Sequence, residues 1–193
     1  MELVKTAIPD VVVLKPKVFE DARGYFFESF SQREFERLVG PVSFVQDNES
    51  KSSYGVLRGL HFQKPPYAQA KLVRVVSGKV LDVAVDIRKG SPTYGKWVSC
   101  ELSGENHLML YLPRGFAHGF SVLSPDVIFQ YKCDNFYHPE CEGAIAWNDP
   151  LLNIDWQIPS DKVVLSIKDT RHKYLSDLEP CFEYIDKKSI CLF

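Results

Sequence analysis

From Val42 onward, the chain consists mostly of short stretches of sheet-forming residues separated by Gly, Pro, Ser and Asn. Many short strands divided by turn residues are typical of a β-sandwich or a β-barrel. Aromatic residues make up 13% of the chain, and they are enriched in strands. The sequence therefore predicts a mainly β protein.

The clearest predicted hairpin is KLVRVVSGKVLDVAVDI, residues 71–87, with Ser77-Gly78 as its turn. A two-residue loop places Val73 opposite Asp82, so that Asp82 could pair with Lys71. The face shared by the two strands would carry Lys71, Val73, Val75, Val80, Asp82 and Ala84. Residues 111–124 predict a second strand pair around a Pro-Arg-Gly turn, and residues 127–133 predict a further strand.

One segment has the pattern of a helix. In SFSQREFERLVG, residues 29–40, Ser31 can cap the helix, Glu34 follows three residues later, and Gly40 ends it. Residues 159–180 predict a short strand followed by a helix or a loop. We interpret residues 1–180 as a single domain, and residues 181–193 as a C-terminal tail without an assigned role.

Composition and charge argue against several classes of function. A net charge of −2 gives no global attraction to nucleic acid or to an anionic membrane, so neither is an expected partner. The N-terminus lacks the pattern of a signal peptide, and no apolar run approaches the length of a membrane span. Five scattered cysteines without a C-x-x-C motif favour a reduced, cytoplasmic setting.

Two of the five histidines, His61 and His118, lie within apolar strand patterns. His107 and His172 lie in polar loops, and we interpret them as solvated surface groups, while His138 precedes a proline in a loop. A metal site in a β-barrel usually gathers two or three histidines and a carboxylate from neighbouring strands. The LHFQ segment offers one histidine, so the sequence predicts no metal site.

A series of motifs, spread over about residues 8–170, closely resembles the dTDP-4-dehydrorhamnose 3,5-epimerase family. In chain order the motifs are VFEDARGYFFESF, FVQDNES, VLRGLHFQ, KLVRVVSGKVLDVAVDIR, SPTYGKW, LPRGFAHGFSVLS, YKC, WNDP and LSIKD. The resemblance implies a cupin-like antiparallel β-barrel (jelly roll) with a few short helices. It also implies an enzyme that needs no metal or other cofactor and forms a homodimer with sites shared across the interface.

The resemblance implies an isomerase that inverts C3 and C5 of dTDP-4-dehydro-6-deoxy-D-glucose to give dTDP-4-dehydro-L-rhamnose, in dTDP-rhamnose biosynthesis. Inversion needs a base on one side of the sugar, an acid on the other, and a group that stabilises the enolate oxygen. His61 is the expected base, with Asp169 fixing its tautomer. Tyr131 is the expected acid, and Lys71 is expected to hold the oxyanion.

The same resemblance implies the substrate-binding residues. Arg58 and Arg23 would bind the diphosphate, and His118 would lie near the sugar. The remaining expected contacts are Glu28, Gln46 and Asn48 to the nucleotide or substrate, Phe26 and Tyr137 to the thymine ring, and weaker contacts from Glu142 and Lys168, for which a surface role is nearly as plausible.

Arg58 and His61 are three residues apart, so strict strand alternation would place them on opposite faces. If both serve one pocket, the strand must break its period, and Gly59 is where a β-bulge would permit this. We therefore predict that Arg58 and His61 open into one cavity, with a break in alternation at or near Gly59.

Other functions remain open from the sequence. A related cupin acting on the same sugar nucleotide could be a 3-epimerase, a 5-epimerase or a 3,4-ketoisomerase, and these share most binding residues. A non-catalytic sugar-binding cupin would need no base and acid, so the presence of His61, Asp169 and Tyr131 argues against it.

Overall fold

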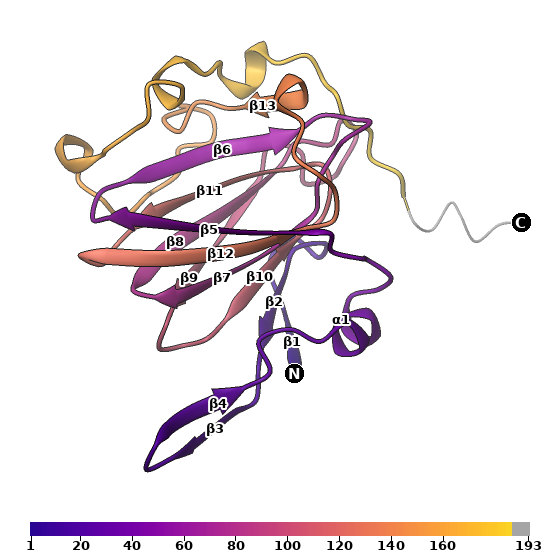
Figure 1. Ribbon diagram of the computed structural model, residues 1–193. Coiled ribbons are helices and arrows are strands. Elements are labelled where there is room, and N and C mark those ends of the chain that lie inside the picture. Colours follow the sequence, from indigo (N-terminus) through magenta and orange to yellow (C-terminus); the bar gives the residue numbers. More distant parts are fainter. Residues whose placement is uncertain (187–193) are drawn as a thin grey trace, which may run out of the picture.

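Two antiparallel β-sheets packed face to face form the body of the protein in the computed structural model, which describes residues 1–186 (Figure 1). The six-stranded sheet runs in the order β1 (Glu2–Lys5), β2 (Val12–Lys15), β10 (Met109–Leu112), β7 (Lys71–Ser77), β12 (Asp126–Cys133) and β5 (Gln46–Ser53). The five-stranded sheet runs in the order β13 (Glu142–Ala144), β6 (Leu57–Gln63), β11 (Phe116–Val122), β8 (Lys79–Asp86) and β9 (Trp97–Ser103). The predicted mainly β, antiparallel fold is confirmed.

The interior between the sheets is apolar over much of its volume. Along β8, Val80 and Ala84 face this interior, whereas Leu81 and Val83 face the opposite side, where the C-terminal half of the chain covers them. Both faces of the five-stranded sheet are thus buried, which explains why its strands read as nearly continuous apolar runs. The inward-facing polar residues described below are exceptions to this pattern.

The predicted hairpin over residues 71–87 is wrong, because β7 and β8 lie in different sheets. β7 pairs with β10 and β12, while β8 pairs with β11 and β9. The turn at Ser77-Gly78 therefore carries the chain from one sheet to the other. The strand pair predicted over residues 111–124 fails for the same reason, since β10 and β11 also belong to different sheets.

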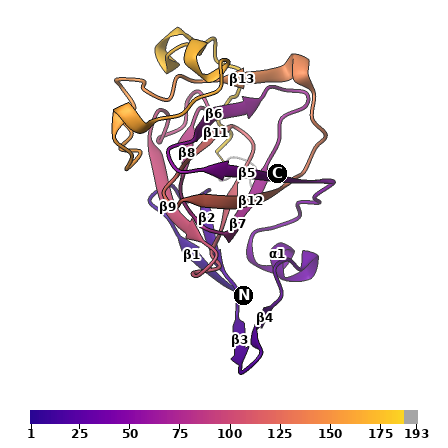
Figure 2. The same ribbon diagram turned by 60° about the vertical axis from the view of Figure 1, so that its left-hand side comes forward.

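A two-stranded ribbon, β3 (Val18–Asp21) with β4 (Gly24–Phe27), projects away from the two sheets (Figure 2). It is followed by α1 (Gln32–Leu38), the predicted helix, which begins after Ser31 at the N-cap position. Phe35 anchors α1 in an apolar cluster on the outer face of the six-stranded sheet. Within the described residues, no helix is long and apolar enough to span a membrane.

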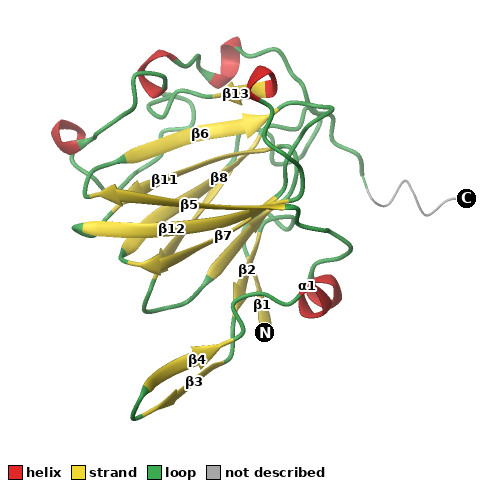
Figure 3. Ribbon diagram, viewed as in Figure 1, coloured by secondary structure: helices red, strands yellow, loops and turns green. Residues whose placement is uncertain are grey.

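The C-terminal part of the chain crosses the outer face of the five-stranded sheet in short 3₁₀ turns, drawn in red above and to the left of β6 (Figure 3). These are η2 (Ser160–Lys162), η3 (Asp169–Arg171) and η4 (Leu175–Asp177), preceded by η1 (Pro139–Cys141). The short strand predicted within residues 159–180 is wrong: Val164 forms only an isolated bridge with Val56. The apolar alternation there reflects packing of Val163 and Leu165 against the sheet.

The segment after Pro180 continues along the body of the molecule as far as it is described. The Phe182 carbonyl accepts a hydrogen bond from the Lys89 amide, and the Tyr184 amide donates to the Lys89 carbonyl, each at 2.8 Å. The rest of the expected tail, residues 187–193, lies outside the described part of the chain.

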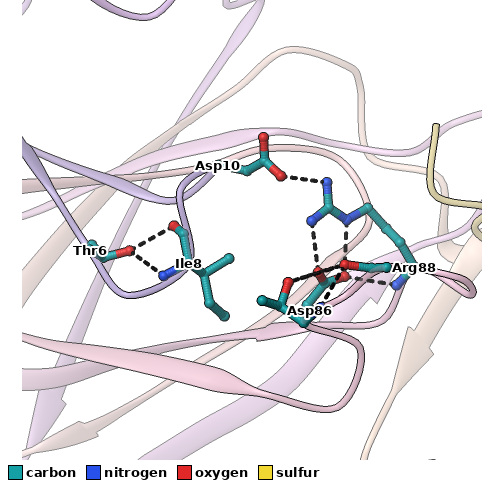
Figure 4. Close-up of polar contacts among 7 residues, drawn as sticks. Thr6, Ile8, Asp10, Asp86 and Arg88 are labelled. Atoms are coloured by element: carbon teal, nitrogen blue, oxygen red, sulfur yellow. Dashed lines mark hydrogen bonds and ion pairs between the residues drawn. The ribbon is translucent and has the colours of Figure 1, made fainter. Parts of the chain in front are cut away.

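A buried polar network lies where β8 ends (Figure 4). The Arg88 guanidinium bonds Asp86 at 2.7 Å and Asp10 at 2.9 Å, and Ser91 and Thr93 each donate to Asp86 at 2.6 Å. Burial alone would raise the pKa of Asp86, but these hydrogen bonds hold it below its usual value. The network connects the N-terminal segment to the sheet.

Candidate active site

A β-bulge in β6 shapes the main cavity. His61 pairs with His118 on β11 and Arg58 pairs with Phe120, so three steps on β6 oppose two on β11. Gly59 has φ +126°, and a Cβ there would lie 2.5 Å from Gly119 Cα; a Cβ on Gly119 would in turn lie 2.7 Å from the Arg58 carbonyl oxygen. The predicted break in alternation at Gly59 is confirmed.

Arg58 and His61 both line one cavity of about 520 Å³ between the two sheets, as predicted. We refer to it as the central cavity. Besides these two residues, its lining includes Asn48, Lys71, His118, Phe120, Phe129, Tyr131, Ser166 and Asp169. The structure thus brings all four expected catalytic residues to one place.

His61 is held by a buried carboxylate. Its Nε2 lies 2.6 Å from Asp169 Oδ1, and the Ser166 hydroxyl donates to Asp169 Oδ2 at 2.8 Å. Burial alone would raise the pKa of Asp169, but hydrogen bonding and charge at His61, followed by bonds from Ser166 and His172, hold that pKa below its usual value. The carboxylate therefore stays ionised at neutral pH and can orient the imidazole.

Tyr131 and Lys71 come from the six-stranded sheet, on the wall opposite His61. Tyr131 lies on β12 and Lys71 begins the neighbouring β7, with its Nζ 5.7 Å from the centroid of the Tyr131 ring. Burial and the neighbouring Cys133 raise the pKa of Tyr131, so its hydroxyl stays protonated at neutral pH. Burial lowers the pKa of Lys71, with nearby Cys133 and acidic groups acting in the opposite direction.

His118 forms a second histidine–aspartate pair beside the first. Its Nε2 lies 2.9 Å from Asp82 Oδ2 and 3.1 Å from Asp82 Oδ1, and both residues are buried. Burial raises the pKa of Asp82, an effect that His118 and Lys71 partly offset. Asp82 and Lys71 thus interact electrostatically across the interior. The sequence indicates that Asp82 could pair with Lys71, but its hydrogen-bond partner in the structure is His118.

A second cavity, of about 330 Å³, adjoins the first and shares Asn48, His61, Lys71 and Tyr131 with it. We refer to it as the side cavity; its other lining residues include Gln46, Gln63, Tyr137 and Glu142. The Gln46 amide donates to Asn48 at 3.0 Å and accepts from the Tyr137 backbone at 3.2 Å. Lys168 reaches Glu142 at 3.4 Å. Gln46, Asn48, Tyr137, Glu142 and Lys168 are therefore neighbours, as the resemblance implies.

Four of the expected binding residues, all within the described part of the chain, line neither cavity: Arg23, Phe26, Glu28 and Lys168, of which Lys168 contacts Glu142, a lining residue of the side cavity. Arg23 and Phe26 belong to the projecting ribbon, or to its turn, where Arg23 bonds Asp21 at 2.6 Å. The Arg23 side chain is 89% exposed and Phe26 is 71% exposed. Within one chain, these residues do not reach the catalytic groups.

The sequence interpretation missed His172. The sequence predicts a solvated surface group at His172, but its Nε2 lies 3.2 Å from Asp169 Oδ1, and its ring stands perpendicular to that of His61 with centroids 5.7 Å apart. The available signal was the spacing: His172 follows Asp169 by three residues, the separation of neighbours in a 3₁₀ turn. The sequence offered one histidine in the LHFQ segment as a metal ligand, whereas His61, Asp169 and His172 offer three ligand atoms within 4.8 Å of one another; the absence of a metal site stays a prediction.

Known proteins resemble this chain over nearly its whole length. The family model described as dTDP-4-dehydrorhamnose 3,5-epimerase matches residues 5–177. The dTDP-4-dehydrorhamnose 3,5-epimerase of Shigella flexneri is 56% identical over 180 residues, which cover 93% of this chain and 98% of the relative.

Solved structures agree with this relationship. The crystal structure of dTDP-6-deoxy-D-glucose-3,5-epimerase RmlC from Legionella pneumophila, in complex with dTDP-4-keto-L-rhamnose, matches with a TM-score of 0.92 and 47% identity, over 96% of this chain and 99% of that one. The 3'-monoepimerase ChmJ from Streptomyces bikiniensis is less similar, with a TM-score of 0.81 and 34% identity over 89% of this chain and 87% of its own. With its cupin-type fold, the chain belongs to the dTDP-4-dehydrorhamnose 3,5-epimerase family of isomerases.

Proposed function

We propose that this chain inverts C3 and C5 of dTDP-4-dehydro-6-deoxy-D-glucose, giving dTDP-4-dehydro-L-rhamnose for dTDP-rhamnose biosynthesis, with His61 as the base and Tyr131 as the acid. One observation carries this assignment. His61 and Tyr131 project from different sheets into the same central cavity. A sugar bound between them would have a proton acceptor on one side and a proton donor on the other.

The base step follows from the geometry of the His61–Asp169 pair. Because Nε2 of His61 bonds the carboxylate, the neutral imidazole carries its proton on Nε2, and Nδ1 keeps the lone pair. Nδ1 then takes the proton from the carbon beside the C4 ketone. The ionised Asp169 stabilises the imidazolium that forms, as in other histidine–aspartate pairs.

The enolate is stabilised from the opposite wall. Lys71 is a buried amine whose charged form burial disfavours, so a developing oxyanion within hydrogen-bond reach would stabilise its ammonium group. This interaction is strongest when the negative charge has developed, and so lowers the barrier rather than merely binding the ketone. His118, next to His61 on the paired strand, adds a polar group near the sugar.

Tyr131 completes the inversion by donating its hydroxyl proton to the face opposite His61. Its raised pKa keeps the phenol protonated at neutral pH, as an acid requires. Each inversion then consists of one C–H bond broken by His61 and one C–H bond formed from Tyr131. The same two groups serve C3 and C5, which are both adjacent to the C4 ketone; between the two inversions His61 releases its proton to water and Tyr131 regains a proton from water.

The rest of the substrate is assigned to the residues around the central and side cavities. Arg58, which bonds the Ser52 hydroxyl at 3.1 Å, would bind the diphosphate. The nucleotide would lie along the side cavity, against Gln46, Asn48 and Tyr137, with weaker contacts from Glu142 and Lys168. The proposed reaction uses no metal and no other cofactor. Four described cysteines are free thiols, which is consistent with a cytoplasmic enzyme.

We assign the projecting ribbon to a homodimer. It exposes Phe19, Tyr25 and Phe26, which are each more than half exposed, on a feature that stands away from the sheets (Figure 1). An exposed apolar surface of this kind is typical of an interface. In such a dimer, Arg23, Phe26 and Glu28 would complete the site of the second chain, and we assign them as binding residues in that position.

The alternatives predict different exchange patterns. In D₂O, a 3,5-epimerase incorporates deuterium at both C3 and C5 of the 4-keto sugar nucleotide, and a monoepimerase at one of them. A 3,4-ketoisomerase moves the ketone, and a binding protein gives no exchange. NMR of the nucleotide sugar with wild-type enzyme distinguishes these outcomes.

The His61→Ala variant tests the role of the base directly. We expect exchange at both carbons to slow about 10²–10⁴-fold, with the affinity for dTDP largely retained. Exchange at near wild-type rate in this variant would contradict the assignment of His61 as the base. This conclusion holds whichever carbons exchange in the wild-type enzyme.

A further inference from the structure

His61, Asp169 and His172 form a compact set of metal-type ligands, and the proposed epimerisation does not explain the presence of His172. Asp169 Oδ1 lies 2.6 Å from Nε2 of His61 and 3.2 Å from Nε2 of His172, so both imidazoles direct the same ring nitrogen at one oxygen. The base needs one carboxylate to fix its tautomer. A second imidazole on that carboxylate has no part in the proposed reaction.

The two spacings from Asp169 Oδ1 are close to those of a zinc site, and all three ligand atoms lie within 4.8 Å of one another. Zinc binds histidine nitrogen and carboxylate oxygen at about 2.0–2.2 Å in tetrahedral geometry, which places neighbouring ligand atoms about 3.3 Å apart. His172 already stands at 3.2 Å from Asp169, and His61 would move outward by a fraction of an ångström. The Ser166 hydroxyl holds Asp169 Oδ2, the kind of supporting hydrogen bond that orients metal-binding carboxylates.

The cluster can be reached from two sides. His61 is one third exposed toward the central cavity. Asp169 and His172 also line a separate cavity of about 330 Å³, together with Trp147 and Tyr174 and without Arg58, Lys71 or Tyr131. A small cation could therefore approach Asp169 and His172 while a sugar occupies the central cavity.

We propose that His61, Asp169 and His172 bind a transition-metal dication of the zinc type, and that this ion switches the enzyme off. Two imidazoles and one carboxylate make a three-ligand set that leaves a fourth position for water. Imidazole ligands favour Zn²⁺ and other divalent first-row transition metals over Mg²⁺, which prefers oxygen ligands. The reaction itself still requires no metal.

Inhibition follows from the position of a single proton. In the metal-free enzyme, Asp169 holds the proton of neutral His61 on Nε2, which leaves the lone pair on Nδ1 for the substrate. Zinc takes the lone pair of Nε2, so the imidazole must carry its proton on Nδ1 instead. The base is then blocked without any loss of space for the sugar. This step rests on the proposed role of His61, whereas zinc binding does not.

The test is a zinc titration of chelator-treated wild-type enzyme, followed by deuterium exchange at C3 and C5 at saturating substrate. We expect kcat to fall at least about tenfold when one equivalent of zinc is bound, with KM unchanged. His172→Gln should need at least about tenfold more zinc for the same fractional loss, each variant being compared with its own zinc-free rate. Zinc can also bind the substrate's diphosphate, but that effect is equal for all variants at one substrate concentration.

His138→Gln is the matched control. His138 also lies beside a carboxylate, with Nδ1 2.9 Å from Glu140, but it belongs to a two-residue pair. This variant should keep wild-type sensitivity to zinc, and Mg²⁺ should inhibit none of the variants through this site. Wild-type enzyme that zinc leaves active, or equal inhibition of wild type and His172→Gln, would overturn the proposal.

A binding measurement separates the two parts. Competition with a chromophoric chelator should give one zinc per chain in the wild type and at least about tenfold weaker binding in His172→Gln and in His61→Gln. If one zinc binds per chain at these residues but deuterium exchange is not slowed, the proposed inhibition is wrong, and the result also counts against His61 as the base. Absence of zinc binding would overturn the site and leave the His61→Ala result unaffected.

Discussion

His61 and His118 lie directly opposite each other on β6 and β11, and each imidazole bonds an aspartate of its own. The two aspartates have different surroundings. Hydrogen bonds hold the pKa of Asp169 below its usual value, whereas burial raises the pKa of Asp82. A charged Asp169 can stabilise an imidazolium, so the His61 pair is suited to proton abstraction and the His118 pair to a structural or polar contact.

This difference predicts unequal effects of two chemically identical substitutions. Asp169→Asn should lower kcat about 10³–10⁴-fold, because an amide neither fixes the correct tautomer nor stabilises the imidazolium. Asp82→Asn should change kcat by less than about tenfold, since Asp82 bonds His118 and not the proposed base. Initial rates over a range of substrate concentrations measure both. Equal losses in the two variants would contradict the assignment.

Removal of the acid should separate exchange from inversion. Tyr131→Phe keeps the ring and removes only the hydroxyl, so His61 can still abstract a proton. We expect deuterium exchange at C3 or C5 to survive better than formation of the L-sugar. NMR records both processes in one sample. If exchange and product formation fall by the same factor, Tyr131 is not a separate acid.

The bulge should tolerate no side chain at Gly59. Gly59→Ala would place a Cβ against Gly119, in addition to the cost of its positive φ. Gly40, with φ +127° and nothing within 4 Å of an added Cβ, is the control for the φ cost alone. Gly59→Ala should therefore lower the free energy of unfolding by at least about 1 kcal/mol more than Gly40→Ala does. Urea denaturation measures the difference, and equal losses would show that the contact relaxes.

The Arg88 network should make stability depend on acid pH. Because the folded pKa of Asp86 is lowered, its contribution to the free energy of unfolding is present above the unfolded pKa of about 3.9 and is lost as pH falls through the lower folded pKa. Asp86→Asn should cost about 3 kcal/mol at pH 7, and less at more acid pH. Urea denaturation at several pH values checks this.

Asp161→Asn is the surface control for that measurement. Asp161 lies 3.6 Å from Lys162 in an exposed pair, which should contribute less than about 1 kcal/mol. A loss in Asp86→Asn that equals the loss in Asp161→Asn, or that does not change with pH, would contradict the role of the network.

Local patterns in the sequence predicted the strands but not their partners. Lys71 and Val73 on β7, and Asp82 and Ala84 on β8, face the interior as their alternation indicates. A turn signal such as Ser77-Gly78 is the same whether the chain folds back within one sheet or crosses to the other. The choice depends on long-range pairing with β10, β11 and β12, which no short segment encodes.

The site also divides into residues that the sequence identifies and contacts that depend on the fold. The resemblance named His61, Lys71, Tyr131 and Asp169, and the fold brings them to one cavity. Their roles remain predictions. His172 was missed because polar neighbours made it look like a surface residue, and its contact with Asp169 depends on a 3₁₀ turn.

The close approach of Gly59 and Gly119 joins two positions that are sixty residues apart in the chain. A side chain on either glycine meets backbone atoms at the other, so a change of residue at one position cannot make room for a side chain at the other. Loss of either glycine would therefore require a shift of the strand that carries His61. The residues permitted at these two positions are thus limited by the backbone of the bulge, independently of the residues to which we assign the chemistry.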